Sequence, residues 1–549
     1  MIRSVTIGLI VLAITLIRSH VEGFGLADEA WFLQVVSRVR SGEALYRDVF
    51  YGATPLAVYL TASLSFLAGV EILIVKLVTN ATFAVTTVLA ERLVRRTGSA
   101  SSMSWIVAGV LLVWGRPYAN PPYTPLAMAF FVATLTATFA TATEYGGGRR
   151  SQPCTRIEWA AIGGWAGLSF AAKQNVGLLA LMAALIAMAA GARDRRRLAV
   201  RAGFIVAGFI VPVVVVLLPV LMDGGLPALW EYGFAGKGAY VRLGGVSYID
   251  SLSGWIHQIG RLPAPSAALE LAHGLVLILP VAVVLFAAHR WQRLDTANAV
   301  LIVFSAAAVA AAYPRWDRFH MAYAVPVLLV TLISLQSTAM RAAPAIRRSL
   351  VRLSPIITIL LFGMVLGPLV AAYAGGDTRE VSMLPHFRGP WVTSETARYL
   401  AESAHSLAQA SGKRPTLVLS TDAGFWYLTS GLNNPTPFDV PSVTSVGRPG
   451  VSSLLTQLST GHLDQVCLDN RRRDLALLEV EAYIRTHFLP GPDVGPCTMY
   501  RMDYADSRAA QGPRLGNPPA RAMMEASGCE SPRSGVVQCF LSSPNMSEE

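Results

Sequence analysis

The sequence predicts a polytopic α-helical membrane protein with about eleven transmembrane helices and a small α/β domain toward its C-terminal end. Three observations support this fold class. Only 14% of the 549 residues are charged, whereas soluble domains carry about 25%. The mean hydropathy is +0.47, and apolar runs near the roughly 20 residues that cross a bilayer recur through residues 1–374. Beyond residue 374 the composition becomes much more polar.

The apolar runs define the spans. They are expected at 4–17, 71–90, 103–115, 124–143, 157–171, 176–191, 202–221, 273–288, 296–312, 321–336 and 354–374. Several are shorter than a full crossing, which predicts tilted or broken helices. The first run has no small-residue cleavage site before His20, so it is interpreted as an uncleaved span rather than a signal peptide.

Basic residues orient these spans. With the N-terminus inside, the inner loops hold 17 arginines, whereas the longer outer loops hold 11 basic residues. The inner set is Arg92, Arg95, Arg96, Arg149, Arg150, Arg156, Arg193, Arg195, Arg196, Arg197, Arg201, Arg290, Arg293, Arg341, Arg347, Arg348 and Arg352. Because basic loops stay cytoplasmic, we expect a multi-pass plasma (inner) membrane protein with a cytoplasmic N-terminus and an extracytoplasmic C-terminal domain. The same clustering explains the net charge of +11 without a nucleic-acid partner.

This topology places the longest segments on the outer face, namely 18–54, 222–272 and everything after 374. The inner loops carry no glycine-rich phosphate loop and no nucleotide-binding fingerprint. An enzyme that acts on the outer face has no access to nucleotide sugars. Its activated substrate is therefore expected to arrive in the lipid.

The first outer loop carries three carboxylates, Asp28, Glu29 and Asp48. From Asp28 onward apolar residues recur at helical spacing, which predicts an amphipathic helix at the membrane interface. A second apolar helix is predicted over 55–69. One alternative is that Asp28 only caps the first helix while Glu29 favours its dipole. That alternative leaves Asp48 unexplained.

The ordered motifs of this loop resemble the GT-C superfamily of glycosyltransferases. They are Asp28-Glu29, Gly42, Tyr46-Arg47-Asp48 and Pro55-Leu56, and a span lies on either side. The resemblance is to the branch with protein mannosyltransferases, aminoarabinose transferases and rhizobial lipopolysaccharide glycosyltransferases. It covers the layout of residues 1–340, with motif detail in 24–60 and weaker detail in 313–326. Residues 1–374 are accordingly expected to form a GT-C-like catalytic domain.

The resemblance implies an integral membrane hexosyl- or pentosyltransferase that uses a polyprenyl-phosphate sugar donor. The acceptor would be a lipid, glycan or protein of a bacterial cell envelope. Asp28 is implied as general base and Glu29 as the catalytic residue that positions the acceptor or its neighbours. Asp48 and Arg47 are candidates for substrate binding, and the alternative is that Asp48 pairs with Arg47 or with another outer arginine. A carboxylate at the low-dielectric edge of a bilayer has a raised pKa and is a better base near neutral pH. One base and a single displacement predict inversion at the anomeric carbon.

Lys173 and Arg116 are candidate cations for the donor phosphate. An ionisable residue between short apolar spans marks a functional site by default. For Lys173 the alternative is equally open that the polar turn around it merely caps two half-helices.

The outer segment 313–320 is the stronger candidate for a phosphate site. Arg315 or Arg318 would clamp the phosphate with bidentate hydrogen bonds. His320 would contact the phosphate or the leaving oxygen, and Asp317 would fix its tautomer. The alternative is that Arg, Asp and His satisfy one another and only anchor the loop.

Two further features of the outer face stay open. Asp28, Asp48 and His320 are ligand types that suit Mg, Mn or Zn, but no metal-binding spacing supports them, so a divalent metal is an option and no cofactor is assigned. The loop 222–272 is rich in aromatic residues, which either stack on sugars or form a belt at the membrane interface. Its glycine pairs would let it move as a lid.

Residues 375–504 are expected to form the extracytoplasmic α/β domain. Strands are predicted at 416–421, 465–469 and 497–502, and helices at 451–461 and 475–487. The turn-rich loop 431–437 is a candidate cover for the active site.

The five cysteines fall into three groups. Cys467 and Cys497 lie on separate predicted strands outside the membrane, where a disulfide persists, and Cys529 and Cys539 are a second candidate pair. Cys154 lies inside and is expected to be free. Residues 505–549 are rich in Pro, Ser, Gly and charge, which predicts a disordered tail.

Two other functions compete with glycosyl transfer. A transporter or flippase of lipid-linked polar substrates would show internal repeats and a site near the bilayer midplane, but the sequence has no internal repeat and its carboxylates lie in an outer loop. A non-catalytic assembly subunit would use Asp28 only as a helix cap.

Overall fold

The computed structural model describes residues 2–98, 102–114, 121–146, 155–190, 194–261, 271, 273–340, 344–374, 379–412, 414–469 and 477–502. The described residues up to Arg501 belong to one compact unit. Each of the eleven predicted spans falls on a helix. These helices are α1 (Ile2–Val21), α4 (Ile72–Arg96), α5 (Met103–Trp114), α6 (Tyr123–Gly146), α7 (Arg156–Ala172), α8 (Gln174–Ala190), α9 (Arg195–Met222), α14 (Leu279–His289), α15 (Thr296–Ala311), α17 (Val325–Met340) and α18 (Pro344–Ala374).

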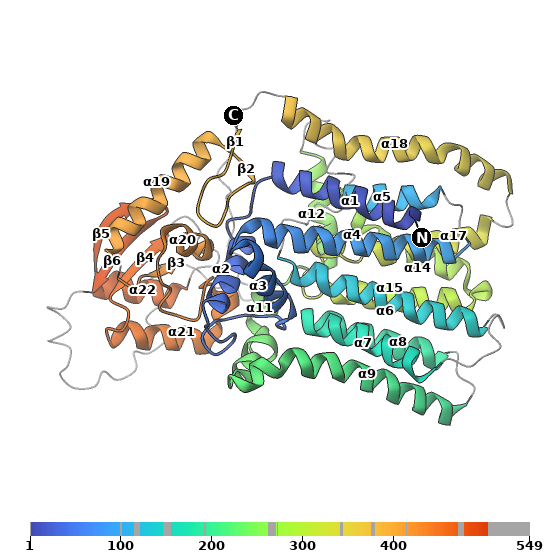
Figure 1. The fold of residues 1–549 in the computed structure, drawn as a ribbon, viewed down its shortest axis with the longest axis horizontal. Helices are drawn as coiled ribbons and strands as arrows, with labels where there is room; N and C mark the ends of the chain where they lie inside the picture. Colours follow the sequence, from blue (N-terminus) through green and yellow to red (C-terminus); the bar gives the residue numbers. More distant parts are fainter. Residues whose placement is uncertain are drawn as a thin grey trace, which may run out of the picture. The chain divides into compact units, whose positions relative to one another are not determined.

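Five of these helices are long and apolar enough to cross a membrane, namely α1, α4, α6, α9 and α18. In the described chain α5, α8, α14, α15 and α17 are shorter apolar helices of the same bundle, and α7 has 17 residues (Figure 1). Tilting accommodates helices of unequal length in one bilayer. The number of crossings therefore stays a prediction.

Short helices lie at one end of the bundle (Figure 1). They include α2 (Asp28–Arg40), α3 (Leu56–Ala68) and α11 (Lys237–Gly244), with the π-helix η2 (Glu231–Ala235) before α11. The remaining short elements are α10 (Leu226–Trp230), α12 (Tyr248–Ile259), η3 (Leu275–Leu277), η4 (Trp291–Arg293) and α16 (Arg318–Ala322). The helices predicted from Asp28 and over 55–69 are thus confirmed as α2 and α3.

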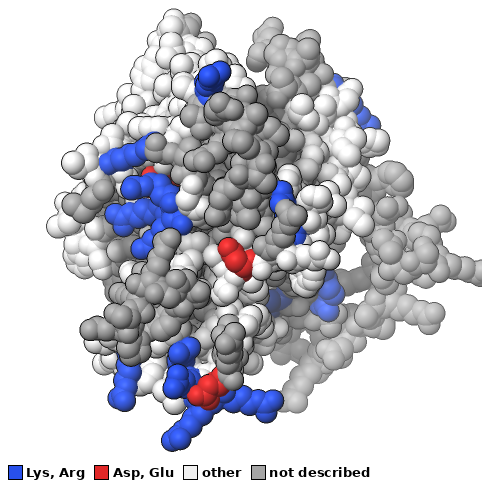
Figure 2. All heavy atoms as spheres, turned by 90° about the vertical axis from the view of Figure 1, so that its right-hand side faces the viewer, with Lys and Arg blue, Asp and Glu red and all other residues white. Residues whose placement is uncertain are grey.

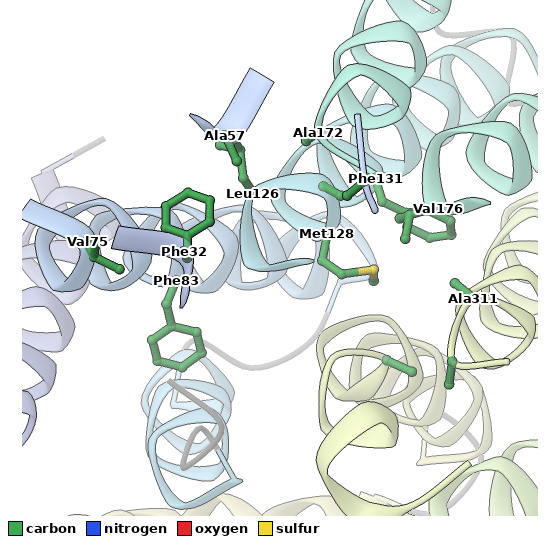
Figure 3. Packing of buried hydrophobic residues seen from close by; sticks show 14 of the residues in the cluster. Phe32, Ala57, Val75, Phe83, Leu126, Met128, Phe131, Ala172, Val176 and Ala311 are labelled. Carbon is green, nitrogen blue, oxygen red and sulfur yellow. The ribbon is translucent and has the colours of Figure 1, made fainter. Parts of the chain in front are cut away.

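The apolar core of the bundle continues into α2 and α3. Phe32 of α2 and Ala57 of α3 lie in the same buried cluster as Phe83 of α4 and Phe131 of α6 (Figure 3). Each of these side chains is at most 3% exposed. Since burying a large apolar side chain contributes about 1.5–3 kcal/mol, this packing fixes α2 and α3 on the bundle.

Helices α7 and α9 pack backbone against backbone. A Cβ atom at Gly163 of α7 would overlap the Ile205 carbonyl, and one at Gly208 of α9 would overlap the Ala160 carbonyl. Gly167, one turn beyond Gly163, faces the Phe209 carbonyl in the same way. Small residues four apart allow such close approach between helices in a membrane.

The C-terminal region combines a small sheet with helices. The strands β1 (Arg379–Val381) and β2 (Trp391–Thr393) pair antiparallel, and a second sheet has the order β3-β4-β6-β5. Its strands are β3 (Leu417–Leu419), β4 (Gln465–Asp469), β5 (Phe488–Val494) and β6 (Cys497–Met502), and the helices are α19 (Ser394–Ser411), α20 (Ala423–Ser430), α21 (Val443–Ser459) and α22 (Leu478–His487). Strand β4 runs parallel to β3 and antiparallel to β6.

The predicted strands and helices of this region all have counterparts, and 465–469 and 497–502 match β4 and β6. Helix α21 begins at Val443 rather than at 451, because two helical segments join across a kink at Gly447. Helices α19 and α20 and strands β1, β2 and β5 were not predicted from the sequence. The boundary placed after residue 374 stays a prediction.

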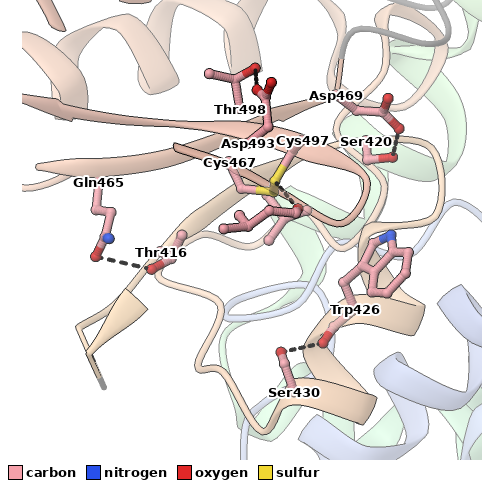
Figure 4. The surroundings of a disulfide bond; sticks show 12 residues. Thr416, Ser420, Trp426, Ser430, Gln465, Cys467, Asp469, Asp493, Cys497 and Thr498 are labelled. Carbon is pink, nitrogen blue, oxygen red and sulfur yellow. Dashed lines mark hydrogen bonds between the residues drawn. A yellow bond between two sulfur atoms is a disulfide. The ribbon is translucent and has the colours of Figure 1, made fainter. Parts of the chain in front are cut away.

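Cys467 and Cys497 form the predicted disulfide between β4 and β6, with their Cα atoms 5.4 Å apart (Figure 4). In the β4–β6 ladder Cys467 pairs with Met499, so the two cysteines lie two residues out of register. Both side chains are buried. Cys154, Cys529, Cys539 and the predicted tail 505–549 lie outside the described residues.

Lys and Arg side chains gather at the end of the bundle away from the sheets, with few acidic residues among them (Figure 2). Arg95 and Arg96 occupy the last turn of α4, Arg156 begins α7, and Arg195 begins α9. These helix ends adjoin loops that the sequence analysis assigns to the cytoplasm. The described part of the chain is thus consistent with that orientation, which remains a prediction.

The close packing of α7 on α9 predicts different effects of valine at two glycines of α9. Gly208→Val should lower the stability of the protein by about 1–3 kcal/mol, because the added side chain meets backbone that cannot rotate away. Gly203→Val is the matched control, since no atom lies within 4 Å of a Cβ there. Thermal unfolding of detergent-purified protein measures both. Equal melting temperatures for the two variants would contradict the packing.

Candidate active site

Asp28 is the first residue of α2, and it does not act as a cap. The N-cap position is Ala27, and no side-chain cap bond is present at this helix start. The alternative that Asp28 only caps the helix is therefore wrong. The residue is exposed, yet enough protein surrounds the carboxyl for desolvation to raise its pKa, partly opposed by the charges of Arg315 and His320. The Asp28 side chain is therefore accessible to solvent, although the surrounding protein partly desolvates its carboxyl group.

Glu29 is held differently from its neighbour. It is 1% exposed, and its carboxylate oxygens lie 3.1 and 3.3 Å from Lys76 Nζ of α4. The Gly25 N–H donates to Glu29 Oε2 at 2.7 Å. Burial raises the pKa of Glu29 although Lys76 and the Gly25 bond oppose the rise. The structure therefore ties Glu29 to the bundle and leaves Asp28 open.

The segment predicted at 313–320 forms an ordered charge cluster. Arg315 Nε lies 3.1 Å from Asp317 Oδ2, and His320 Nδ1 lies 2.9 Å from Asp317 Oδ1. Asp317 also caps α16 by accepting from the N–H groups of Phe319 and His320. Burial alone would raise the pKa of Asp317, but the bonds and charges of His320 and Arg315 lower it.

Arg315 has neighbours beyond this cluster. It contacts the Tyr240 hydroxyl of α11, and its charge reaches the Asp28 carboxyl. The Val246 N–H donates to the Pro314 carbonyl at 3.0 Å, and the Trp316 N–H donates to the Val246 carbonyl at 3.0 Å. The outer loop 222–272 thus holds the backbone around Arg315. The mutual pairing expected of a purely anchoring cluster is present, but the charge of Arg315 also acts on Asp28.

Two enclosed lysines lie at the same end of the bundle. Lys173 stands between α7 and α8, and its Nζ is 3.1 Å from Thr124 Oγ1. Lys237 begins α11, and its Nζ would lie 2.7 Å from a Cβ at Gly52. Burial lowers the pKa of each ammonium to about 8, and repulsion from Lys237 contributes at Lys173. Within the described ranges, neither ammonium has a carboxylate within ion-pair distance.

Aromatic rings connect Asp28 to these lysines. Trp31, Tyr51 and Tyr123 form a triangle with ring centroids 5.7, 6.2 and 6.5 Å apart. Lys173 Nζ lies 5.5 Å from the Tyr123 ring centroid, and Lys237 Nζ lies 5.6 Å from that of Tyr240. Cations over aromatic faces gain about 0.5–2 kcal/mol. The rings therefore help to hold cations that lack carboxylate partners.

The Tyr46-Arg47-Asp48 motif builds a tight turn. Tyr46 has a positive φ of 72°, and its hydroxyl donates to the Ala53 carbonyl at 2.6 Å. Asp48 accepts from Arg47 and from the Ala44 N–H, which lowers the pKa of Asp48 to about 2. Arg47 Nη1 otherwise reaches the Asp223 carbonyl at 3.4 Å. These contacts give Arg47 and Asp48 a structural role in this turn.

The remaining candidates add little. Arg318 Cζ lies 5.0 Å from the Phe319 ring centroid, and Arg116 lies outside the described residues. The metal option finds no support in the site itself: among the described residues no group of three or more His, Cys, Asp or Glu could hold an ion. Asp48 is already paired with Arg47, and the charges nearest Asp28 are those of Arg315 and His320. These residues do not fit a metal.

The sequence analysis missed Lys76 and Lys237. A lysine inside a span is costly, so Lys76 carried a signal, but nothing in the sequence connected it to Glu29. Lys237 stands between glycines in Ala235-Gly236-Lys237-Gly238-Ala239. A lone cation in a glycine-rich outer segment next to aromatic residues was the available signal.

The chain shares its fold with a protein of known structure. It is similar to the crystal structure of ArnT from Cupriavidus metallidurans bound to undecaprenyl phosphate, with a TM-score of 0.56, 12% identity, and coverage of 91% of this chain and 97% of that one. The apo state of the same protein gives a TM-score of 0.41 and 14% identity at the same coverage. No protein-family model and no curated protein matches the sequence. The likeness shows that this chain has the fold of ArnT.

The ion pair of Glu29 and Lys76 predicts a non-additive response to substitution. Glu29→Gln or Lys76→Met alone should destabilise the protein by about 3–5 kcal/mol, because each leaves a buried charge without its partner. The double variant should recover most of this loss. Thermal unfolding measures all three, with Arg414→Met as a control at the exposed pair with Asp464. Additive losses in the double variant would contradict the pairing.

Proposed function

We propose that the chain is an integral membrane glycosyltransferase that moves a sugar from a polyprenyl-phosphate donor to a cell-envelope acceptor. The observation that carries this proposal is the charge pattern around Asp28. One accessible carboxylate is under the influence of the Arg315 charge, and two enclosed ammonium groups at the same end of the bundle have no carboxylate partner in the described chain. A site with surplus positive charge and one open carboxylate suits an anionic donor and an acceptor that must lose a proton. The ArnT fold, solved there with undecaprenyl phosphate, supports the same donor class.

The cations account for recognition of the phosphate. Burying an ammonium group without a counter-ion is costly, and both Lys173 and Lys237 have pKa values lowered to about 8 by that cost. A bound phosphate would remove the penalty and restore their charges. Arg315 would add a planar fork suited to phosphate oxygens. His320, with its Nδ1 bonded to Asp317, would present Nε2 to the phosphate or the leaving oxygen.

Asp28 would be the general base of a single displacement. Desolvation raises its pKa, which makes its ionised form a stronger base than an ordinary aspartate. The acceptor hydroxyl would give its proton to Asp28 as the acceptor oxygen bonds to the anomeric carbon. The bond between that carbon and the phosphate oxygen would break, and the polyprenyl phosphate would leave with the electron pair. The configuration at the anomeric carbon would invert.

Glu29 would support this step without touching the substrate. Its bonds to Lys76 and to the Gly25 N–H fix the first turn of α2 against α4. Because Asp28 lies in the same turn, this fixed turn also sets the direction in which the Asp28 side chain leaves the helix. We propose Glu29 as a positioning residue, and we assign Arg47 and Asp48 to the turn that follows α2.

The same proposal includes the topology. Eleven spans, a cytoplasmic N-terminus and an extracytoplasmic α/β domain would place Asp28, Lys173 and Arg315 at the outer face. The gathering of arginines at the other end of the bundle supports this orientation (Figure 2). A bacterial inner membrane then supplies the polyprenyl-phosphate donor, and the acceptor would be a lipid, glycan or protein outside the cytoplasm.

Substitution of Asp28 tests the proposed base. Asp28→Asn and Asp28→Ala should slow consumption of the lipid-linked sugar at least about 100-fold, since general bases contribute 10²–10⁴-fold. Binding of undecaprenyl phosphate should persist. The assay compares membranes from cells that lack the chain and from complemented cells, with lipid-linked sugars and envelope glycans measured by mass spectrometry. Asp223→Asn, at an exposed outer carboxylate, is the control.

Two outcomes would reject the proposal. Wild-type consumption by both Asp28 variants would exclude the base. Movement of an intact lipid-linked sugar across the membrane, without release of polyprenyl phosphate, would identify a flippase instead.

The enclosed lysines predict pH-dependent binding of undecaprenyl phosphate. Each ammonium is charged below its pKa of about 8, so the affinity of the protein should fall as the pH rises from about 7 to about 9. Lys237→Gln should weaken binding about tenfold at neutral pH and flatten the profile, because one titrating group is lost and its repulsion of Lys173 disappears. Arg242→Gln, exposed on the same helix, should bind as wild type does. A profile unchanged by Lys237→Gln would contradict a phosphate contact by Lys237.

A further inference from the structure

Arg38 connects the helix of Asp28 to the C-terminal region. The guanidinium, 8% exposed, lies 2.6 Å from Glu43 Oε2 and donates to the Asp48 carbonyl at 2.9 Å. It also donates to the Thr436 carbonyl at 2.9 Å and to Asp439 Oδ1 at 3.2 Å. One buried side chain thus joins α2, the turn at 43–48 and the loop 434–439.

The same loop also contacts the segment that carries Lys237. The Phe50 N–H donates to the Pro437 carbonyl at 2.8 Å. The rings of Phe50, Phe438 and Tyr232 meet with centroids 4.9, 5.7 and 6.3 Å apart. Tyr232 belongs to the π-helix η2, which ends two residues before Lys237. The candidate site has two halves, namely α2 with Asp28 and the segment with Lys237. The loop 434–439 therefore contacts both halves.

Helix α20 adds a contact near Asp28 itself. A Cβ atom at Gly424 would lie 2.8 Å from the Trp31 Cα, so α20 meets the backbone of α2 one turn after Asp28. The C-terminal region thus holds α2 near both of its ends, through Gly424 at the start and through Arg38 at the end. Figure 1 shows α20 beside α2.

We propose that the loop 434–439 positions the two halves of the active site relative to each other, with Arg38 as the positioning residue for Asp28 and Tyr232 as that for Lys237. This inference rests on the proposed function, because it assigns the base to one half and the phosphate contact to the other. The base must lie within hydrogen-bonding reach of the acceptor hydroxyl while the donor phosphate occupies the lysines. A misplacement of about 1 Å costs about 100-fold in such reactions.

Asp439, the carboxylate of this loop that pairs with Arg38, lies inside the protein. Asp439 is fully buried, accepts from Asn434 Nδ2 at 2.8 Å, and has no further partner for Oδ2 among the described residues. Burial raises the pKa of Asp439 to about 6 despite Arg38. Loss of Arg38 alone would leave an uncompensated buried carboxyl. Removal of both charged groups should spare the fold, because apolar side chains often replace a buried ion pair without loss of stability, while it cuts the connection.

The first test separates the two halves with two variants. The double variant Arg38→Met/Asp439→Leu should fold, bind undecaprenyl phosphate as wild type does, and consume lipid-linked sugar about tenfold to 100-fold more slowly. Tyr232→Leu should instead weaken binding of undecaprenyl phosphate about tenfold at neutral pH. Arg414→Met and Leu489→Ala, at exposed sites of the C-terminal region, are the matched controls.

The second test measures position directly and does not depend on activity. Spin labels at Ser41, just after α2, and at Arg242 of α11 occupy exposed residues, once the three cysteines outside the disulfide are replaced. The wild-type background should give one narrow distance distribution between them by double electron–electron resonance. Both variants should broaden or shift that distribution.

The outcomes distinguish the inference from the proposed function. Wild-type distances, binding and consumption in both variants would overturn the positioning role while the proposed function stands. A wild-type protein that neither binds undecaprenyl phosphate nor consumes lipid-linked sugar would reject the function, and with it the inference. Equal loss of binding and consumption in both variants, with unchanged distances, would also overturn the division of roles.

Discussion

The ion pair between Glu29 and Lys76 determines which carboxylate of the Asp28-Glu29 pair is open. Its two side chains are at most 3% exposed, and the 3.1 Å contact joins α2 to α4, 47 residues along the chain. A charge buried without its partner costs several kcal/mol, so α2 cannot rotate to expose Glu29 without a large penalty. Asp28, one residue earlier and about 100° around the helix, is thereby turned away from this pairing. The position of Asp28, the proposed base, is therefore set by the Glu29–Lys76 ion pair, in which Asp28 takes no part.

At the end of the bundle that carries α2 and α11, some cationic side chains have a carboxylate partner and others do not. Arg38, Arg47 and Arg315 each have a carboxylate within ion-pair distance. Lys173 and Lys237 have Thr124 and aromatic rings instead. The fold pairs Lys76 with a carboxylate, but in the described chain it leaves these two ammonium groups without one. This lack of pairing costs free energy and does not stabilise the fold. An anionic ligand explains that cost better than packing does.

The helices could be predicted from the sequence, but the contacts between distant segments could not. Eleven apolar runs and the strands β4 and β6 could be read from periodicity, and Asp28 could be chosen from its place after the first span. The partner of Glu29 and the contacts of the loop 434–439 could not, because they join segments up to 401 residues apart. For Tyr46-Arg47-Asp48 the local sequence predicts a contact with substrate, which stays a prediction, and it does not predict the bonds that close a tight turn around a positive φ. A sequence motif marks residues as candidates, but the role of each residue depends on the contacts that it makes in the fold.

The location of the charged groups also weighs against a transporter. Asp28 begins α2, Lys173 joins α7 to α8, and Arg315 lies between α15 and α16. These positions are helix ends at one end of the bundle, where α2 and α11 also lie (Figure 1). A carrier that alternates access keeps its site near the bilayer midplane, between broken helices. A transferase whose donor floats in one leaflet needs its base and its phosphate contacts at that leaflet's surface. The arrangement therefore favours chemistry at one membrane face over passage through the membrane.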